Sequence, residues 1–202
     1  MLSWRIPVLM VATLLSISFK SEALPFDDAS VRLVARAYAL SMPLLFEENE
    51  LIPLMAANKT DFLAGGRAII YMQALGTALV QAGVAAGAQI NSDPSVSKKF
   101  GGLMPPGLES LPAQADAQMR SRANGLIMVG QELLWLSQVL PPAANGDYNL
   151  YNTTATPFRQ QLIAQVPTYR IYAQYPGGLA MIQQQELLAE NTIYNLAIQV
   201  FK

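Results

Sequence analysis

Two residues near the middle of the chain have the types and spacing of a nucleophilic site. Ser95 and Lys98 match the S-x-x-K pattern, in which a lysine one helical turn away helps to activate a serine nucleophile. The S-D-N and K-T-G elements that accompany this pattern in serine enzymes of that class are missing, and residues 91–93 and 59–61 resemble them only in composition. The match also lies in a loop flanked by prolines. An exported cell-wall enzyme that uses Ser95 and Lys98 is therefore the least favoured of three functional hypotheses.

A second candidate is the acidic cluster Glu47, Glu48 and Glu50. Carboxylates this close could form an acid–base pair or bind calcium, but both sites need further oxygen ligands at set positions. The surrounding sequence contains no Asp-x-Asp loop, so a solvated helix end is the favoured interpretation. We predict no metal site and no cofactor.

The composition narrows the function further. The 202 residues include no histidine and no cysteine, which argues against most zinc sites and against Ser-His-Asp and Cys-His catalysis. We therefore predict no catalytic residue and no enzymatic activity. The net charge is −1 and no basic patch is present, so nucleic acid is not an expected partner. Only 13% of the residues are charged, a share about half the usual one, which suggests extra buried surface against a partner protein or a membrane.

The N-terminus resembles a cleavable export signal. Arg5 precedes the fourteen uncharged residues 6–19, which are fewer than the roughly 20 that a membrane-spanning helix needs. Lys20 follows, and Ser21 and Ala23 place small residues three and one positions before a cut. We predict a signal peptide over residues 1–23 and export to the periplasm or cell envelope, with an uncleaved anchor as the alternative. The absence of a cysteine at the cut argues against a lipoprotein.

The rest of the chain, residues 24–202, is predicted to form one all-α domain, a bundle of about five helices with two Pro/Gly-rich loops. A helix is expected to start at Asp27–Ser30, and Pro141–Pro142 is expected to end a long helix that begins at Ala113. Residues 91–112 and 141–154 are the two predicted loops. Residues 175–178 should separate the last helix, residues 179–201, from the segment before it. One face of that last helix is apolar: Ile182, Ala189, Ile193, Leu196 and Val200.

The segment Ala68–Ile90 contains no charged residue. Gly76, Gly83 and Gly87 are spaced by seven and four, which puts them on one helical face and predicts close approach of another helix. Two interpretations remain open. The segment is either a central helix buried in a soluble bundle or an oligomerising transmembrane helix, for which Gly83 and Gly87 form a G-x-x-x-G pair.

A cluster of tyrosines lies in the C-terminal part of the chain. Tyr169, Tyr172 and Tyr175 recur every three residues, with Arg170 among them, and form an aromatic ridge if the segment is helical. Phenol rings suit a partly wet interface, so these four residues are predicted to bind a partner protein. The alternative is that they form the edge of the bundle itself.

Residues 165–174, QVPTYRIYAQ, and 185–196, QELLAENTIYNL, together resemble the C-terminal region of IcmX-type proteins. The R-I-Y-A step and the later L-L-A-E-x-x-x-Y step occur in the same order, over about residues 115–200. IcmX-type proteins are periplasmic components of Dot/Icm type IVB secretion systems. The resemblance implies a structural, non-enzymatic role in an envelope-spanning secretion or conjugation apparatus, with other protein subunits as partners. This is the favoured hypothesis, ahead of a small membrane protein spanning at Ala68–Ile90.

Overall fold

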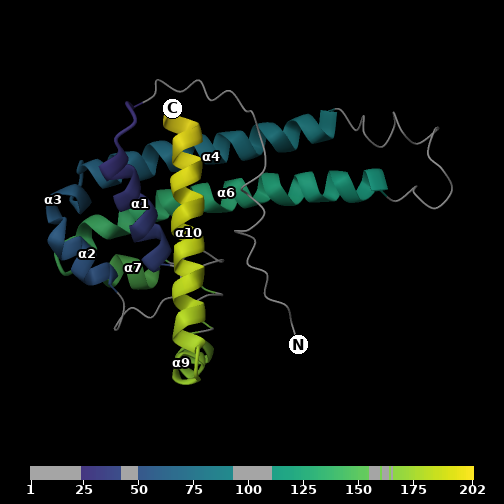
Figure 1. Ribbon diagram of the computed structural model, residues 1–202. Coiled ribbons are helices and arrows are strands. Elements are labelled where there is room, and N and C mark those ends of the chain that lie inside the picture. The colour runs from purple at the N-terminus through teal and green to yellow at the C-terminus, as the bar shows by residue number, and fades with distance from the viewer. Residues whose placement is uncertain (1–23, 42–49, 93–110, 155–159, 161–163, 165) are drawn as a thin grey trace.

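The computed structural model describes residues 24–41, 50–92, 111–154, 160, 164 and 166–202, and the regular elements in these ranges are all α-helices (Figure 1). They are α1 (Asp28–Ser41), α2 (Leu51–Ala57), α3 (Lys59–Phe62), α4 (Arg67–Ser92), α6 (Leu111–Ala144), α7 (Asn149–Thr153), α9 (Val166–Gln174) and α10 (Gly178–Phe201). The predicted all-α class is confirmed. The predicted signal peptide, residues 1–23, lies outside the described residues.

The start of α1 is fixed by the capping residue that the sequence indicates. The Ser30 hydroxyl donates a hydrogen bond to the Asp27 carboxylate at 2.5 Å, and the Ala29 amide donates to the same side chain at 3.3 Å. An acidic side chain at this position satisfies amide groups that have no partner within the helix. The predicted helix start at Asp27–Ser30 is therefore confirmed.

The antiparallel pair α4 and α6 forms the centre of the fold, and the distal parts of both helices extend beyond the other described helices (Figure 1). The core lies where α1 and the C-terminal part of α10 pack with this pair. Its largest fully buried side chains include Tyr38, Phe62, Met72, Leu75, Leu79, Leu133, Leu136, Leu140 and Ile193.

Two of the three glycines on α4 lie where its backbone meets that of α6. A Cβ on Gly76 would lie 2.8 Å from the carbonyl oxygen of Gly130, and a Cβ on Gly83 would lie 2.6 Å from that of Ala123. Real Cβ atoms do not approach a backbone oxygen so closely, so both positions require glycine. Gly130 matches them from the other side, since its own Cβ would lie 2.6 Å from the carbonyl oxygen of Gly76. The close helix packing expected at this face is thus a contact within the chain.

Gly87 differs from the other two glycines. No described atom lies within 4 Å of the position that its Cβ would occupy, so Gly87 takes no part in the close approach among the described residues. The helical stretch Lys59–Ile90 is long and apolar enough to cross a membrane by length and composition, but 56% of its most apolar window is buried inside the protein. This burial favours the central-helix interpretation of Ala68–Ile90.

The prediction that Pro141–Pro142 would end the long helix is wrong, because α6 continues to Ala144 with both prolines inside its last turn. Each proline lacks the amide that would bond to the preceding turn, which weakens the helix there. Leu140 and Ala143 are nevertheless buried in the core, and we infer that this packing holds the last turn in place. The amides of Gly146 and Asp147 then bond to Ala143 and Pro142 and end the helix.

The predicted loop 141–154 contains the short helix α7, which is a second correction. The amide of Asn149, the first residue of α7, donates to the Asp147 carboxylate at 3.0 Å, a turn that leads the chain into the helix. Tyr151 then packs its ring against Trp135, with ring centroids 4.9 Å apart, and the Trp135 indole donates to the Thr154 hydroxyl at 3.2 Å. A helix this short depends on such tertiary contacts.

Candidate partner-binding surface

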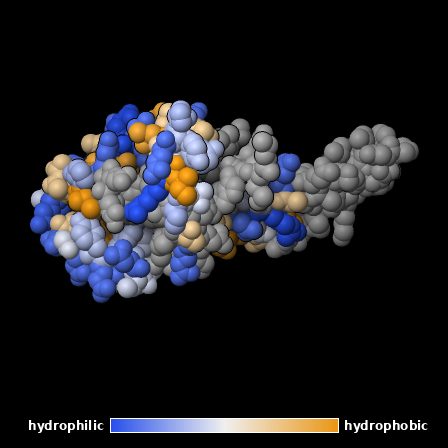
Figure 2. All heavy atoms as spheres, turned by 90° about the horizontal axis from the view of Figure 1, so that it is seen from below, coloured by the Kyte–Doolittle hydropathy of each residue, from blue (hydrophilic) through white to orange (hydrophobic). Residues whose placement is uncertain are grey.

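The C-terminal hairpin, residues 166–187, comprises α9 and the first part of α10 and lies at one end of the molecule (Figure 1). Among the described side chains of this hairpin, six large apolar ones are exposed: Ile171, Tyr172, Tyr175, Leu179, Met181 and Leu187. Seen from the end at which α9 lies, hydrophobic side chains reach the surface in separate patches among hydrophilic ones (Figure 2). Exposed apolar side chains are concentrated on this short stretch of the chain, which makes the hairpin the candidate surface for contact with a partner.

Local sequence determines the turn of the hairpin. Gly177 has φ 82°, a left-handed conformation that glycine adopts without strain, and the Gly178 amide donates to the Tyr175 carbonyl at 2.9 Å. A Cβ on Gly178 would collide with the Tyr172 carbonyl, so α9 and α10 meet closely at this point. The predicted break at residues 175–178 is confirmed.

The apolar side chains of the hairpin do not share one face. Leu179 and Met181 are two positions apart on α10, which corresponds to about 200° of rotation, yet both are about half exposed. No charged residue lies between Arg170 and Glu186. A partner that covers this surface therefore meets apolar and uncharged groups on more than one side.

The structure places the predicted partner-binding residues on this hairpin. Tyr175 and Tyr172 are 62% and 49% exposed, and Arg170 is also exposed. The side chain of Tyr169 lies outside the described part of the structure. The regular three-residue spacing therefore selects two of the six exposed apolar side chains.

The other exposed residues were missed by this reasoning. Met181 and Leu187 lie off the apolar face of α10 that Ile182 and Ile193 share, and those two residues are buried as predicted. Leu179 lies three positions before Ile182, on the same face, and is exposed all the same. An apolar residue that falls outside an amphipathic face is a signal that the sequence alone provides. Here that signal would have identified Met181 and Leu187 but not Leu179.

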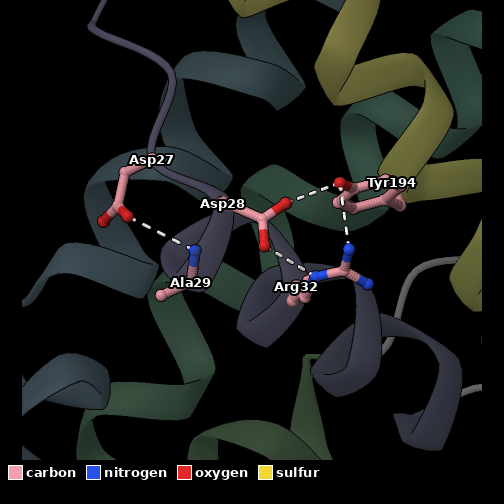
Figure 3. A network of polar contacts seen from close by, with 5 residues as sticks. All are labelled: Asp27, Asp28, Ala29, Arg32 and Tyr194. Atoms are coloured by element: carbon pink, nitrogen blue, oxygen red, sulfur yellow. Dashed lines mark hydrogen bonds and ion pairs between the residues drawn. The ribbon is translucent and has the colours of Figure 1, made fainter.

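Farther along α10, a polar network on the seam between α1 and α10 holds this helix to the body (Figure 3). The Tyr194 hydroxyl donates to Asp28 at 2.5 Å, and Arg32 donates through Nε to Asp28 at 2.8 Å and through Nη2 to the Tyr194 oxygen at 3.2 Å. The hydrogen bond from Tyr194, and then that from Arg32, lowers the pKa of Asp28. The same Tyr194–Asp28 bond raises the pKa of Tyr194. Because these groups are exposed, their bonds add little to the stability of the fold. Their main effect is to fix the position of α10 along α1.

A second ionic group lies nearer the hairpin. Arg36 donates through Nη2 to Glu50 at 2.6 Å and through Nη1 to Glu190 at 3.2 Å, which links α1 both to the residue before α2 and to α10. Burial acts to lower the pKa of Arg36, but the bonds to Glu50 and Glu190 outweigh it and raise this pKa. Glu50 remains largely exposed, as expected, but it is paired.

The remaining sequence candidates do not meet in the structure. Glu47, Glu48, Ser95 and Lys98 lie outside the described residues. Within the described ranges, no three His, Cys, Asp or Glu side chains are grouped so that they could hold a metal ion. The surface of the hairpin is therefore the candidate site that the described residues support.

Comparisons with protein-family models, with curated proteins and with solved structures find no match for this chain.

Proposed function

We propose that the protein is a non-enzymatic structural protein of the periplasm or cell envelope that acts through protein–protein contacts. It is exported by the N-terminal signal peptide and forms part of a type IV secretion or conjugation apparatus. The observation that carries this proposal is the C-terminal hairpin, on which six large apolar side chains are exposed among those that the structure describes, and which has no charge between Arg170 and Glu186. Burial of such a surface by a partner is favourable in free energy, because it removes apolar side chains from water.

The resemblance to IcmX-type proteins involves the same part of the chain, which supports the proposal. Its first segment, residues 165–174, covers α9, and its second, residues 185–196, lies in α10. The apparatus, the partner subunits and the envelope location are proposed from this resemblance together with the predicted export signal.

The alternative of a membrane-spanning helix at Ala68–Ile90 is less well supported. The glycines that would form a helix–helix contact in a membrane include Gly83, whose space is occupied by α6 of the same chain. The other half of the G-x-x-x-G pair, Gly87, has no described atom within contact distance of its Cβ position.

The proposal predicts how the protein behaves in fractionated envelopes of cells that produce it. After mild detergent extraction, the wild-type protein is expected to co-purify with large membrane-derived complexes. Replacing both Tyr175 and Leu179 by aspartate should reduce the recovered share about tenfold or more, because a few central apolar residues carry most of the energy of an interface. Unchanged unfolding of the purified variant would show that the loss is not a folding defect.

Val84→Asp is the matched control for this experiment. Val84 is 56% exposed, close to Leu179 at 53%, but it lies on α4. The control should co-purify like wild type. Recovery of the wild-type protein only as a free monomer at every expression level, or loss of co-purification in the Val84 variant alone, would contradict the proposal.

A further inference from the structure

Arg36 of α1 pairs with two carboxylates near the base of the hairpin, those of Glu50 before α2 and Glu190 of α10. A third carboxylate, that of Glu186 on α10, forms no ion pair with Arg36 but lies close enough to be influenced by the charges of all three residues. Because α10 carries the hairpin beyond this point, the strength of this contact determines how firmly the hairpin is held.

The guanidinium does not serve the three carboxylates equally. Its two terminal nitrogens bond to Glu190 and Glu50, at 3.2 and 2.6 Å. No described residue donates a hydrogen bond to Glu186. Glu186 lies one helical turn before Glu190 on α10, a spacing at which two like charges repel each other.

Glu186 is also partly buried. This burial, more than any other cause, raises the pKa of Glu186 above its ordinary value of 4.5; Arg36 opposes the shift, and Glu50 and Glu190 add to it. Among the described residues, these three are the charged groups that act on Glu186, from α1, from the residue before α2 and from α10 itself. The ionised carboxyl is therefore the unfavourable form in the docked arrangement.

We propose that Arg36, Glu50, Glu186 and Glu190 form a proton-sensitive clamp that fastens the hairpin more tightly to α1 as the pH falls from neutral to mildly acidic. A proton on Glu186 removes a half-buried charge and its repulsion with Glu190, while Arg36 keeps its bonds to Glu50 and Glu190. The inference rests on the proposed function in one respect only, namely that the hairpin is the partner-binding surface. At mildly acidic pH, α10 is then held more firmly to α1, and the partner-binding surface that it carries is more rigid.

The sign of this pH effect follows from the linkage between proton binding by Glu186 and the docking of α10 against α1. A carboxyl whose pKa is higher in the docked state than in the detached state binds its proton more tightly when docked. Above the pKa that Glu186 has in the docked state, docking carries the full free-energy cost of burying its ionised carboxyl. The penalty disappears as the pH falls from that value to the ordinary pKa of 4.5. Opening of α10 should therefore become rarer on acidification across this interval.

Hydrogen exchange of the isolated, folded chain tests the clamp without any partner. After correction for intrinsic exchange rates, the opening equilibrium of amides in residues 182–190 should be at least about twofold lower near pH 4.5 than near pH 7, because the docked state is stabilised as Glu186 takes up its proton. Glu186→Gln, a neutral side chain of the same shape, should show the low opening at both pH values.

Asp147→Asn is the matched control, because it removes an exposed carboxylate that is not among the groups acting on Arg36 or Glu186 and keeps an oxygen that can accept the bond from the Asn149 amide. It should retain the full pH response. An equal response in wild type and Glu186→Gln, or greater opening of Glu186→Gln at neutral pH, would overturn the clamp. Because no partner takes part, such a result would leave the proposed function standing, and failed co-purification would leave the clamp standing.

Discussion

Replacing Gly83 by alanine should lower the free energy of unfolding by about 1–3 kcal/mol, although alanine is the better helix former. The added Cβ would lie 2.6 Å from the carbonyl oxygen of Ala123 and equally close to the Ile127 side chain, so the α4 and α6 backbones must separate. The same substitution at Gly87 adds a methyl group where no described atom lies within 4 Å. It should raise the free energy of unfolding by about 0.5–1 kcal/mol, because alanine loses less backbone entropy than glycine.

Chemical denaturation of the two purified variants against wild type measures this difference. The pair also separates the two interpretations of α4. A glycine pair that joined two membrane helices would make both positions sensitive, and both substitutions would weaken oligomers in detergent. Equal loss at Gly83 and Gly87 would contradict the packing described here. A loss confined to Gly83, with the opposite sign at Gly87, is the expected result.

The largest loss of stability is expected from a cavity in the core. Leu136 of α6 is fully buried, and Leu136→Ala should lower the free energy of unfolding by about 2–5 kcal/mol, because it removes apolar contacts and leaves a space that the helices fill only in part. Leu187→Ala is the same chemical change at a side chain that is 55% exposed on the hairpin. It should change stability by less than about 0.5 kcal/mol.

Thermal or urea unfolding of the two leucine variants provides the measurement. A large loss for Leu187→Ala would mean that this face of the hairpin is covered within the chain and is not free for a partner. A small loss for Leu136→Ala would mean that α6 does not form the centre of the core.

Signals within a few residues predicted much of the fold correctly. The Asp27 cap, the Pro-Gly-Gly turn and the apolar face of α10 all act over distances that the local sequence contains. Pro141 and Pro142 misled because their local effect, the loss of two helical hydrogen bonds, is outweighed by burial of Leu140 and Ala143, which only the tertiary structure reveals.

The partners of the predicted residues could not be derived in this way. Gly76 signals close packing, but nothing in the sequence identifies Gly130 as the residue that it meets. Arg36 and Glu190 are separated by 154 positions, so their ion pair depends on how α10 crosses α1. The sequence predicted only part of the candidate site, because the rest depends on contacts between segments that are distant in the chain. The tyrosine spacing indicated the segment, while the exposure of Leu179, which lies on the apolar face of α10, depends on which helices pack against that part of α10.

The most direct test of the central claim, that the hairpin binds a protein partner in the envelope, is site-specific photocrosslinking in living cells that produce the protein. A photoreactive phenylalanine derivative at position 175 should yield discrete adducts with subunits of one envelope complex, which mass spectrometry identifies. The same residue at position 84, an exposed site on α4, should yield none. Absence of any protein adduct at position 175, or the same adducts at both positions, would contradict the claim.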